Sequence, residues 1–268
     1  MPIITLTTDW SKGDYYVAAV KGAILKQAPD CIIVDVSHDI KQFQTAHAAF
    51  LLKHTFPYFP HQTIHIIGVN TEIAYDEPLI VCKIANQYFL GIDNGQFSLI
   101  SETPPEVVVE IQPDRFNLQL QTFPVLNLYV DVACKLANGI DILSLGIQKS
   151  QIKQLIEFNP AIDENSINAR VIYTDSYGNA ITNVSRETFE RVGKERKFTI
   201  WVQTRKNEIV QINTSYNEVE GGALLAVFNS LNLLEIAINK GSAVDLLGIK
   251  ASDTTIIIRF KPSFDSVT

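Results

Sequence analysis

Apolar and polar residues follow two different patterns along the chain, and the change lies near residue 150. In the first part, short apolar runs alternate with segments whose apolar residues recur at helical spacing. The runs typical of buried strands are Ile3–Thr7, Cys31–Val36, Thr63–Val69, Pro78–Ala85, Tyr88–Ile92 and Val107–Ile111. The segments with helical spacing are Tyr15–Gln27, Gln44–His54 and Leu128–Ala137. Strands that alternate with helices predict an α/β domain with a mostly parallel sheet over residues 1–150.

The second part has the pattern of a β-protein. Residues 151–168 are polar and lack periodicity, so we interpret them as a linker. Strand-like runs then follow at Ala169–Tyr173, Lys197–Gln203, Glu208–Asn213, Leu224–Phe228 and Thr254–Phe260, with Thr204–Asn207 as a hairpin connection. Strands at this density predict a small all-β barrel as a C-terminal domain over residues 169–268.

Composition narrows the classes of partner. The chain of 268 residues carries a formal net charge of −7, which argues against binding to nucleic acid or to an anionic membrane. No apolar run reaches the roughly 18 residues that span a bilayer, and the N-terminus lacks the features of a signal peptide. Cys31, Cys82 and Cys134 lie in apolar contexts and are interpreted as reduced core residues of a cytoplasmic protein. The spacing of Cys and His predicts no metal site.

Two carboxylates follow the first predicted strand. Asp9 follows the predicted strand Ile3–Thr7, with one residue between them. It lies at the edge where open α/β sheets bind ligands. A carboxylate only accepts hydrogen bonds, so it is suited to a pair of vicinal hydroxyls such as those of a ribose. Asp14 precedes the first predicted helix, where it is either an N-cap or a second ligand contact. The opening segment therefore predicts a site for a small polar molecule.

A second polar segment lies at the start of the C-terminal domain. Asp175-Ser176-Tyr177-Gly178-Asn179 is followed by Thr182-Asn183. The segment is either a simple turn that uses the glycine, or a loop that presents a carboxylate, an aromatic face and amides to a ligand. An aromatic ring can stack on a purine, and an amide can recognise its edge.

These segments together resemble a known family. TLTTDW with Asp14 and Lys21-Gly22 resembles the TTDFG…D…KG opening of the S-adenosylmethionine (SAM) hydroxide adenosyltransferases, which are related to the fluorinase and chlorinase enzymes. The resemblance continues through VDVSHDI at Val34–Ile40, Asp93-Asn94-Gly95, DSYGNAITN at Asp175–Asn183, Asn229-Ser230 and LEIAINKGSA at Leu234–Ala243. It implies an α/β N-terminal domain and a β-barrel C-terminal domain. It also implies a homotrimer that holds an adenosyl ligand between one subunit's N-terminal domain and a neighbour's C-terminal domain, with SAM as substrate or ligand and no further cofactor.

The resemblance also implies roles for single residues. Asp9 matches the carboxylate that holds the ribose hydroxyls, and Asp14 matches a residue near the methionine part. Phe43 falls where an aromatic ring lines the region of the sulfonium and ribose. Asp175 and Ser230 match groups at the methionine end. Tyr177 and Asn179 match the adenine-binding aromatic and amide, with Tyr216 as a second stacking ring.

Three positions depart from the family pattern. The resemblance implies an Asp, an Arg and a His that position the attacking water, and Asn70, Glu77 and Pro124 occupy those places. Asn has no ionisable carboxylate, Pro has no side-chain donor, and the exchange of Arg for Glu reverses a charge. Glu77, or the neighbouring Asp76, could instead activate water itself. The catalytic residues are therefore unassigned.

Three hypotheses follow from this combination. In the first, the protein cleaves SAM with water to adenosine and methionine. In the second, it is a catalytically inactive homotrimer that binds or senses an adenosyl ligand. In the third, only the trimeric scaffold persists. The retained residues count against the third hypothesis, and the three departures leave the choice between the other two open.

Overall fold

Two compact units make up the computed structural model, and each is described by itself. The structure describes residues 1–116, 122–156, 159–251 and 253–262. The units are Met1–Ile156 and Glu157–Thr268. The predicted linker range 151–168 contains the strand β8 (Ala161–Ile162) and the first residues of β9 (Ser166–Thr174).

The N-terminal unit is built on a seven-stranded sheet with the order β2-β1-β3-β5-β4-β6-β7. Its first four strands in that order are parallel, and β4, β6 and β7 are added in antiparallel fashion. The strands are β1 (Ile3–Thr8), β2 (Ile32–Ser37), β3 (Ile64–Gly68), β4 (Leu79–Ile84), β5 (Gln87–Ile92), β6 (Val107–Ile111) and β7 (Gly146–Gln148).

The sheet is therefore mixed, and the prediction of a mostly parallel sheet is only partly right. The reason is the connection between β4 and β5, which consists of Ala85 and Asn86 with φ values of 49° and 60°. A two-residue turn with two left-handed residues joins antiparallel strands only, because a parallel pair needs a long crossover.

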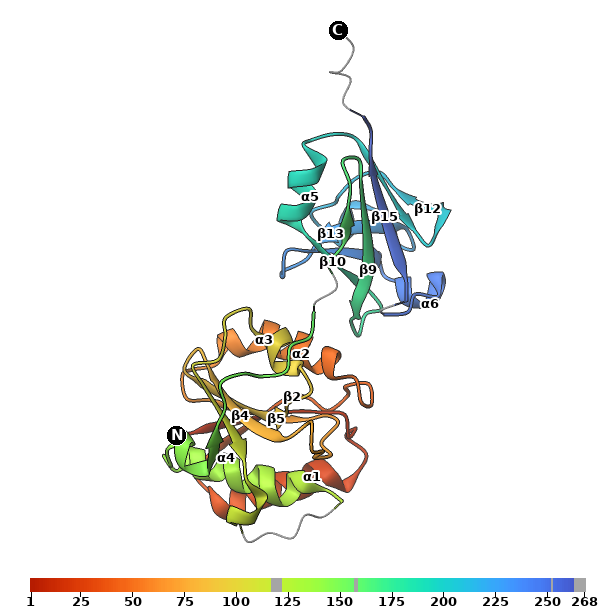
Figure 1. The fold of residues 1–268 in the computed structure, drawn as a ribbon. Coiled ribbons are helices and arrows are strands. Elements are labelled where there is room, and N and C mark those ends of the chain that lie inside the picture. Colours follow the sequence, from red (N-terminus) through yellow and green to blue (C-terminus); the bar gives the residue numbers. More distant parts are fainter. Residues whose placement is uncertain (117–121, 157–158, 252, 263–268) are drawn as a thin grey trace. The chain divides into compact units, whose positions relative to one another are not determined.

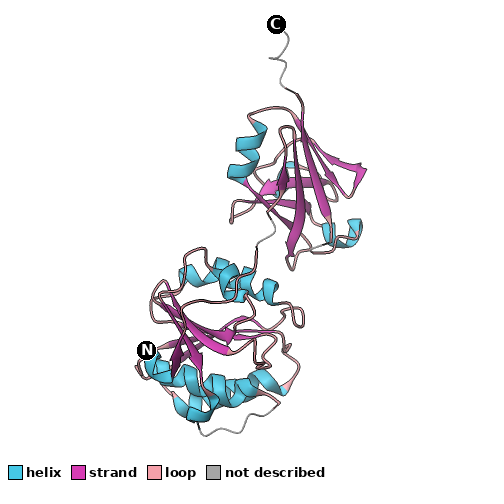
Figure 2. Cartoon of the chain, viewed as in Figure 1, coloured by secondary structure: helices cyan, strands magenta, loops and turns pink. Residues whose placement is uncertain are grey.

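Helices cover both faces of this sheet (Figures 1 and 2). The helices α1 (Tyr15–Gln27) and α4 (Val130–Ala137) pack with one face, and α2 (Thr45–Thr55) and α3 (Gln96–Ile100) pack with the other. A π-helical turn, Val125–Tyr129, leads into α4, so the predicted helix Leu128–Ala137 is longer at its start. Two buried clusters result, one on each face of the sheet, as expected for a three-layer α/β unit.

One polar residue is fully buried within β3. His65 lies between the Thr5 hydroxyl and the Gln87 side-chain oxygen, each 2.7 Å from a different ring nitrogen, and it stacks on Phe89. Burial lowers the pKa of His65 to about 4, so the ring is neutral at pH 7. The imidazole forms hydrogen bonds with its polar neighbours in the core and lies away from solvent.

The C-terminal unit is an antiparallel, nearly closed barrel. Its sheet has the order β12-β11-β15-β9-β10-β14-β13, with β8 paired to β9, and contacts between β12 and β13 bring its two ends together. The further strands are β10 (Ala180–Ser185), β11 (Phe198–Val202), β12 (Thr204–Ile209), β13 (Leu224–Phe228), β14 (Leu233–Ile238) and β15 (Thr255–Phe260). Two short helices, α5 (Arg186–Gly193) and α6 (Ala243–Leu247), accompany the barrel. The predicted barrel thus contains some helix, and its hairpin turns at Gln203 (φ 60°), because residues 204–207 belong to β12.

Candidate functional site

The carboxyl ends of the parallel strands place Asp9 at one edge of the N-terminal sheet. Asp9 follows β1 directly, and its Oδ2 accepts a hydrogen bond from the backbone N–H of Phe43 at 2.9 Å. This bond joins two loops that are 34 residues apart in the chain. Burial raises the pKa of Asp9 above its ordinary value, and the hydrogen bond from Phe43 opposes that rise. One carboxylate oxygen is held by the protein, and the half-buried group retains acceptor capacity for a ligand.

A buried histidine fixes the end of β1. The Thr8 hydroxyl lies 2.8 Å from Nδ1 of His38, and Nε2 of His38 lies 3.1 Å from Oδ1 of Asp35. Lys21 in turn lies 2.6 Å from the other oxygen of that carboxylate. The backbone of Ser11 also donates to the carbonyl of His38. This network indicates that His38 fixes the turn after β2 to the end of β1, which leads into Asp9.

An aromatic cluster joins the Asp9 loop to the segment that contains Pro124. The Phe123 ring lies 5.0 Å from Trp10 and 4.9 Å from Tyr16, both in edge-on contact. Trp10 also covers Gly68 at the end of β3, where a Cβ atom would lie 2.5 Å from the indole. The ends of β1 and β3 and the start of the π-helical turn therefore meet around Trp10. Of the three positions predicted to depart from the family pattern, Pro124 follows Phe123 and Asn70 lies two residues beyond Gly68.

Asp14 and Phe43 both extend toward solvent. Asp14 occupies the N-cap position of α1, but its side chain accepts no cap hydrogen bond, so the capping alternative does not explain it. Phe43 has a φ of 61° and a side chain that is 71% exposed. An exposed aromatic ring in a left-handed backbone conformation is strained locally and lacks a place in the core. Neither side chain therefore contributes to the core of the N-terminal unit.

Glu77 is paired with a cation. Lys153 Nζ lies 2.7 Å from its carboxylate, and the backbone N–H of Lys153 donates to Asp93 at 2.9 Å. Burial raises the pKa of Asp93, while Lys149 and Lys153 oppose that rise. The ion pair places an ammonium group beside Glu77, the position that the sequence predicts to replace an arginine of the family pattern. It also engages one oxygen of Glu77, which weakens the case for that carboxylate as a base.

The predicted loop of the C-terminal unit is organised by Asp175. Its Oδ1 accepts hydrogen bonds from the backbone of Tyr177 and Asn179 at 3.0 and 2.8 Å. Its Oδ2 accepts from the Asn179 side chain at 3.0 Å. Asn179 is consequently buried, whereas Tyr177 is 79% exposed. Gly178 adopts a φ of +78° against Ser242, as the turn alternative predicts, and the ligand contacts of this loop stay a prediction.

A cavity of about 480 Å³ opens in the C-terminal unit beside this loop. Three of the predicted residues, Asp175, Tyr216 and Ser230, line it, whereas Tyr177 and Asn179 are outside its lining. The lining residues that the sequence did not predict include Phe228, whose ring lies 4.5 Å from the Arg186 guanidinium, and the buried Glu235. An acidic residue within the apolar run Leu233–Ile238 was the available signal for Glu235.

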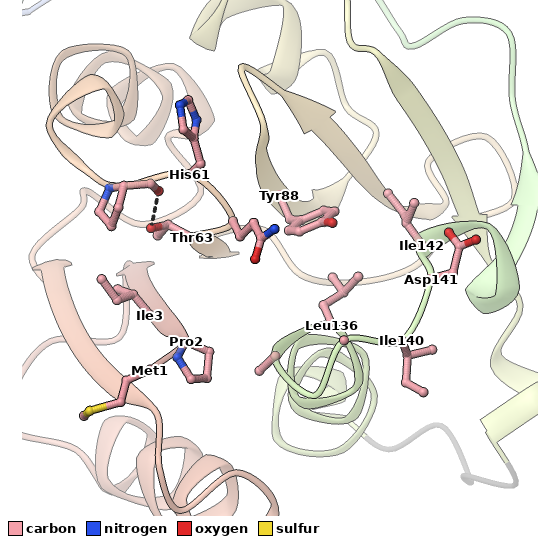
Figure 3. A pocket seen from close by; sticks show the side chains of 14 residues that line it. Met1, Pro2, Ile3, His61, Thr63, Tyr88, Leu136, Ile140, Asp141 and Ile142 are labelled. Carbon is pink, nitrogen blue, oxygen red and sulfur yellow. Dashed lines mark hydrogen bonds between the residues drawn. The ribbon is translucent and has the colours of Figure 1, made fainter.

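A second cavity of about 490 Å³ lies in the N-terminal unit (Figure 3). Ile3, Thr63 and Tyr88 among its lining residues lie at or beside the amino ends of β1, β3 and β5. This is the edge of the sheet opposite to Asp9, so the cavity is separate from the predicted site.

Metal ligation and membrane insertion were considered for the residues that the structure describes. No group of three or more His, Cys, Asp or Glu side chains in the described part of the chain could hold a metal ion. No helix among the described residues is both long and apolar enough to cross a membrane.

Comparisons with known proteins match the whole architecture. Residues 4–146 match the model of the SAM hydroxide adenosyltransferase N-terminal domain, and residues 169–256 match that of its C-terminal domain. The chain belongs to this family. An (R)-S-adenosyl-L-methionine hydrolase of Methanocaldococcus jannaschii is 31% identical over 96% of both chains, and one of Thermus thermophilus is 28% identical over 91% of this chain and 94% of its own.

Solved structures of similar fold agree. The crystal structure of an uncharacterized conserved protein from Thermotoga maritima has a TM-score of 0.84 and 25% identity, over 96% of this chain and 99% of its own. A conserved hypothetical protein from Thermus thermophilus has a TM-score of 0.74 and 26% identity, over 97% and 100% of the two chains. Family membership confirms the resemblance that the motifs carry.

Proposed function

We propose that this protein hydrolyses SAM to adenosine and methionine. Water attacks C5′ of the ribose, the C5′–sulfur bond breaks, and its electron pair stays on the sulfur of methionine. The proton lost by the water goes to solvent or to a nearby base. The match of both family domains along the chain, together with the Asp9 carboxylate held at the end of β1, carries this proposal.

The proposed ligand contacts fall in both units. Asp9 accepts hydrogen bonds from the ribose hydroxyls. Asp14 lies near the methionine part of SAM, and Phe43 lines the region of the sulfonium and ribose. In the C-terminal unit, Asp175 and Ser230 hold the methionine end. Tyr177 and Asn179 contact the adenine, and Tyr216 stacks on it. The exposure of Asp14, Phe43 and Tyr177 supports contacts with groups outside their own unit. We therefore also propose a homotrimer whose neighbouring subunits complete the site, in a cytoplasmic protein whose three cysteines are reduced.

The departures at Asn70, Glu77 and Pro124 are compatible with turnover. The leaving group begins as a sulfonium cation and departs as a neutral thioether, so orientation of the water contributes much of the acceleration. An Asn70 amide can orient water by donating or accepting hydrogen bonds, although it cannot take its proton. The ammonium of Lys153, held by Glu77, supplies a positive charge in the same loop region.

The test follows adenosine release from SAM by chromatography, with the binding of SAM and adenosine measured by calorimetry. We expect turnover by the wild type, and a loss of about 10- to 100-fold in kcat/KM for Asp9→Asn, since hydrogen bonds to a charged group are stronger than neutral ones. Asp30→Asn is the matched control, because Asp30 is exposed between α1 and β2. Binding without turnover would reject the hydrolase, and failure to bind SAM or adenosine would reject the site. Light scattering tests the trimer, and a monomer would contradict it.

A further inference from the structure

A carboxylate is buried in the middle of the C-terminal sheet without a cation. Glu235 lies on β14, where it pairs with Ile181 of β10 on one side and Val227 of β13 on the other. Its side chain is 3% exposed. Its neighbours in sequence, Leu234 and Ile236, point into the apolar core of the barrel. Because side chains alternate along a strand, Glu235 faces the opposite side, and Ile181 and Val227 both line the cavity there.

Both oxygens of Glu235 are used by residues of the cavity wall. The Tyr216 hydroxyl donates to Oε1 at 2.7 Å, and the Asn229 side-chain N–H donates to Oε2 at 3.1 Å. The orientation of the Asn229 amide is itself fixed, since its oxygen accepts from the backbone of Leu231 and Leu233. The amide therefore has only its nitrogen to offer to Glu235. Burial raises the pKa of Tyr216, and the hydrogen bond to the Glu235 carboxylate raises it further, so the phenol remains the donor.

Stability does not account for this carboxylate. Glu235 forms no ion pair with any described residue, and the described lining of the cavity contains neither Lys nor Arg. A buried charge without a cation is costly, and well-packed apolar residues at such positions are often neutral or stabilising. An apolar residue would continue the pattern of Leu233–Ile238. The two hydrogen bonds to the cavity wall are what an apolar residue at this position would remove.

We propose that Glu235 is a positioning residue for the ligand site. It fixes the ring of Tyr216 on the cavity wall and so sets the affinity for the adenosyl ligand, whereas the turn Asn229-Ser230 is already held by the bonds of the Asn229 oxygen to Leu231 and Leu233. The inference rests on the proposed function, since Tyr216 and Ser230 are the predicted contacts there. Glu235 itself touches no reacting atom. Removal of the Glu235 charge should change ligand affinity through Tyr216. A general structural role would instead lower the stability of the fold.

Glu235→Gln separates charge from shape. We expect KM for SAM and the dissociation constant of adenosine to rise about tenfold, because a hydrogen bond to a charged group becomes a neutral one. We expect kcat to change by less than about threefold, since the reacting atoms keep their surroundings. The unfolding temperature should stay the same or rise. Glu208→Gln is the matched control, because Glu208 is an exposed residue of β12 in the same unit.

A second variant tests the route through Tyr216. In a Tyr216→Phe background, the ring remains but its hydroxyl is absent, so Glu235→Gln should add less than about twofold to KM. An unchanged KM in Glu235→Gln, full additivity in the double variant, or a fall in kcat and unfolding temperature at constant KM would overturn the positioning role while turnover by the wild type stands. A wild type that neither binds nor cleaves SAM would remove the proposed function and this inference with it.

Discussion

Gly178→Ala is a sharp test of the loop that Asp175 organises. Gly178 has a φ of +78°, which alanine adopts at a cost of about 1–2 kcal/mol. The new Cβ would also lie 2.1 Å from Oγ and 2.6 Å from Cβ of Ser242, the residue that caps α6. Overpacking of this kind costs about 1–3 kcal/mol. We therefore expect a total loss of about 2–5 kcal/mol in the free energy of unfolding, measured by urea denaturation with far-UV circular dichroism.

Gly222→Ala separates the two contributions. Gly222 has a similar φ of +87°, but no atom lies within 4 Å of the place that a Cβ would take, so only the backbone cost of about 1–2 kcal/mol applies. The difference between the two variants should therefore be about 1–3 kcal/mol. We also expect Gly178→Ala to weaken adenosine binding, because the clash shifts a loop that borders the cavity. Equal losses of stability in the two variants would refute the assignment of the Ser242 contact.

Three further outcomes follow from the titratable groups. The neutral His65 should contribute its full stabilisation above pH 6.5. The free energy of unfolding should then fall by up to roughly 3 kcal/mol as the pH falls from 6.5 through the His65 pKa of about 4, because the unfolded chain binds the proton more readily. Urea titrations of His65→Gln should lack that part of the pH dependence, and parallel curves would contradict the assignment. Glu77→Gln should retain most of the turnover, since Lys153 already engages the carboxylate; abolished adenosine release would instead identify Glu77 as the base. Because burial raises the pKa of Asp9, kcat/KM should begin to fall with acid at a higher pH than an exposed aspartate would give, and Asp9→Asn should remove this limb of the pH profile.

Apolar periodicity predicts much of the fold. The prediction of a mostly parallel sheet is only partly right, and the reason is local. The α/β order of the first unit follows from buried runs and helical spacing. The antiparallel addition of β4 could have been recognised, because only two residues separate the predicted strands Pro78–Ala85 and Tyr88–Ile92. Ala85-Asn86 lacks the glycine that usually marks such a turn, so composition gave no warning. The helices α5 and α6 are too short for periodicity to identify them.

The site was accessible only in part, because it depends on contacts between distant segments. Asp9 could be predicted from its place after a strand, but its bond to the Phe43 backbone spans 34 residues. Glu235 lies in a run that looks like ordinary core, and its role depends on Tyr216 and Asn229 from other parts of the barrel. The pairing of Glu77 with Lys153 joins residues 76 positions apart. Tertiary pairing of this kind carries no periodic signal in the chain.

The hydrogen bonds within the Asp175–Asn179 loop have a consequence for the entropy and kinetics of binding. Because this loop is already closed on itself, its backbone does not need to be ordered when a ligand arrives, and ordering costs about 1–2 kcal/mol for each residue. Small fragments of the ligand should therefore bind with an affinity per non-hydrogen atom that is high for their size. Association should also follow simple second-order kinetics without a slow ordering phase. Stopped-flow traces with adenosine would be single exponentials whose rate rises linearly with concentration.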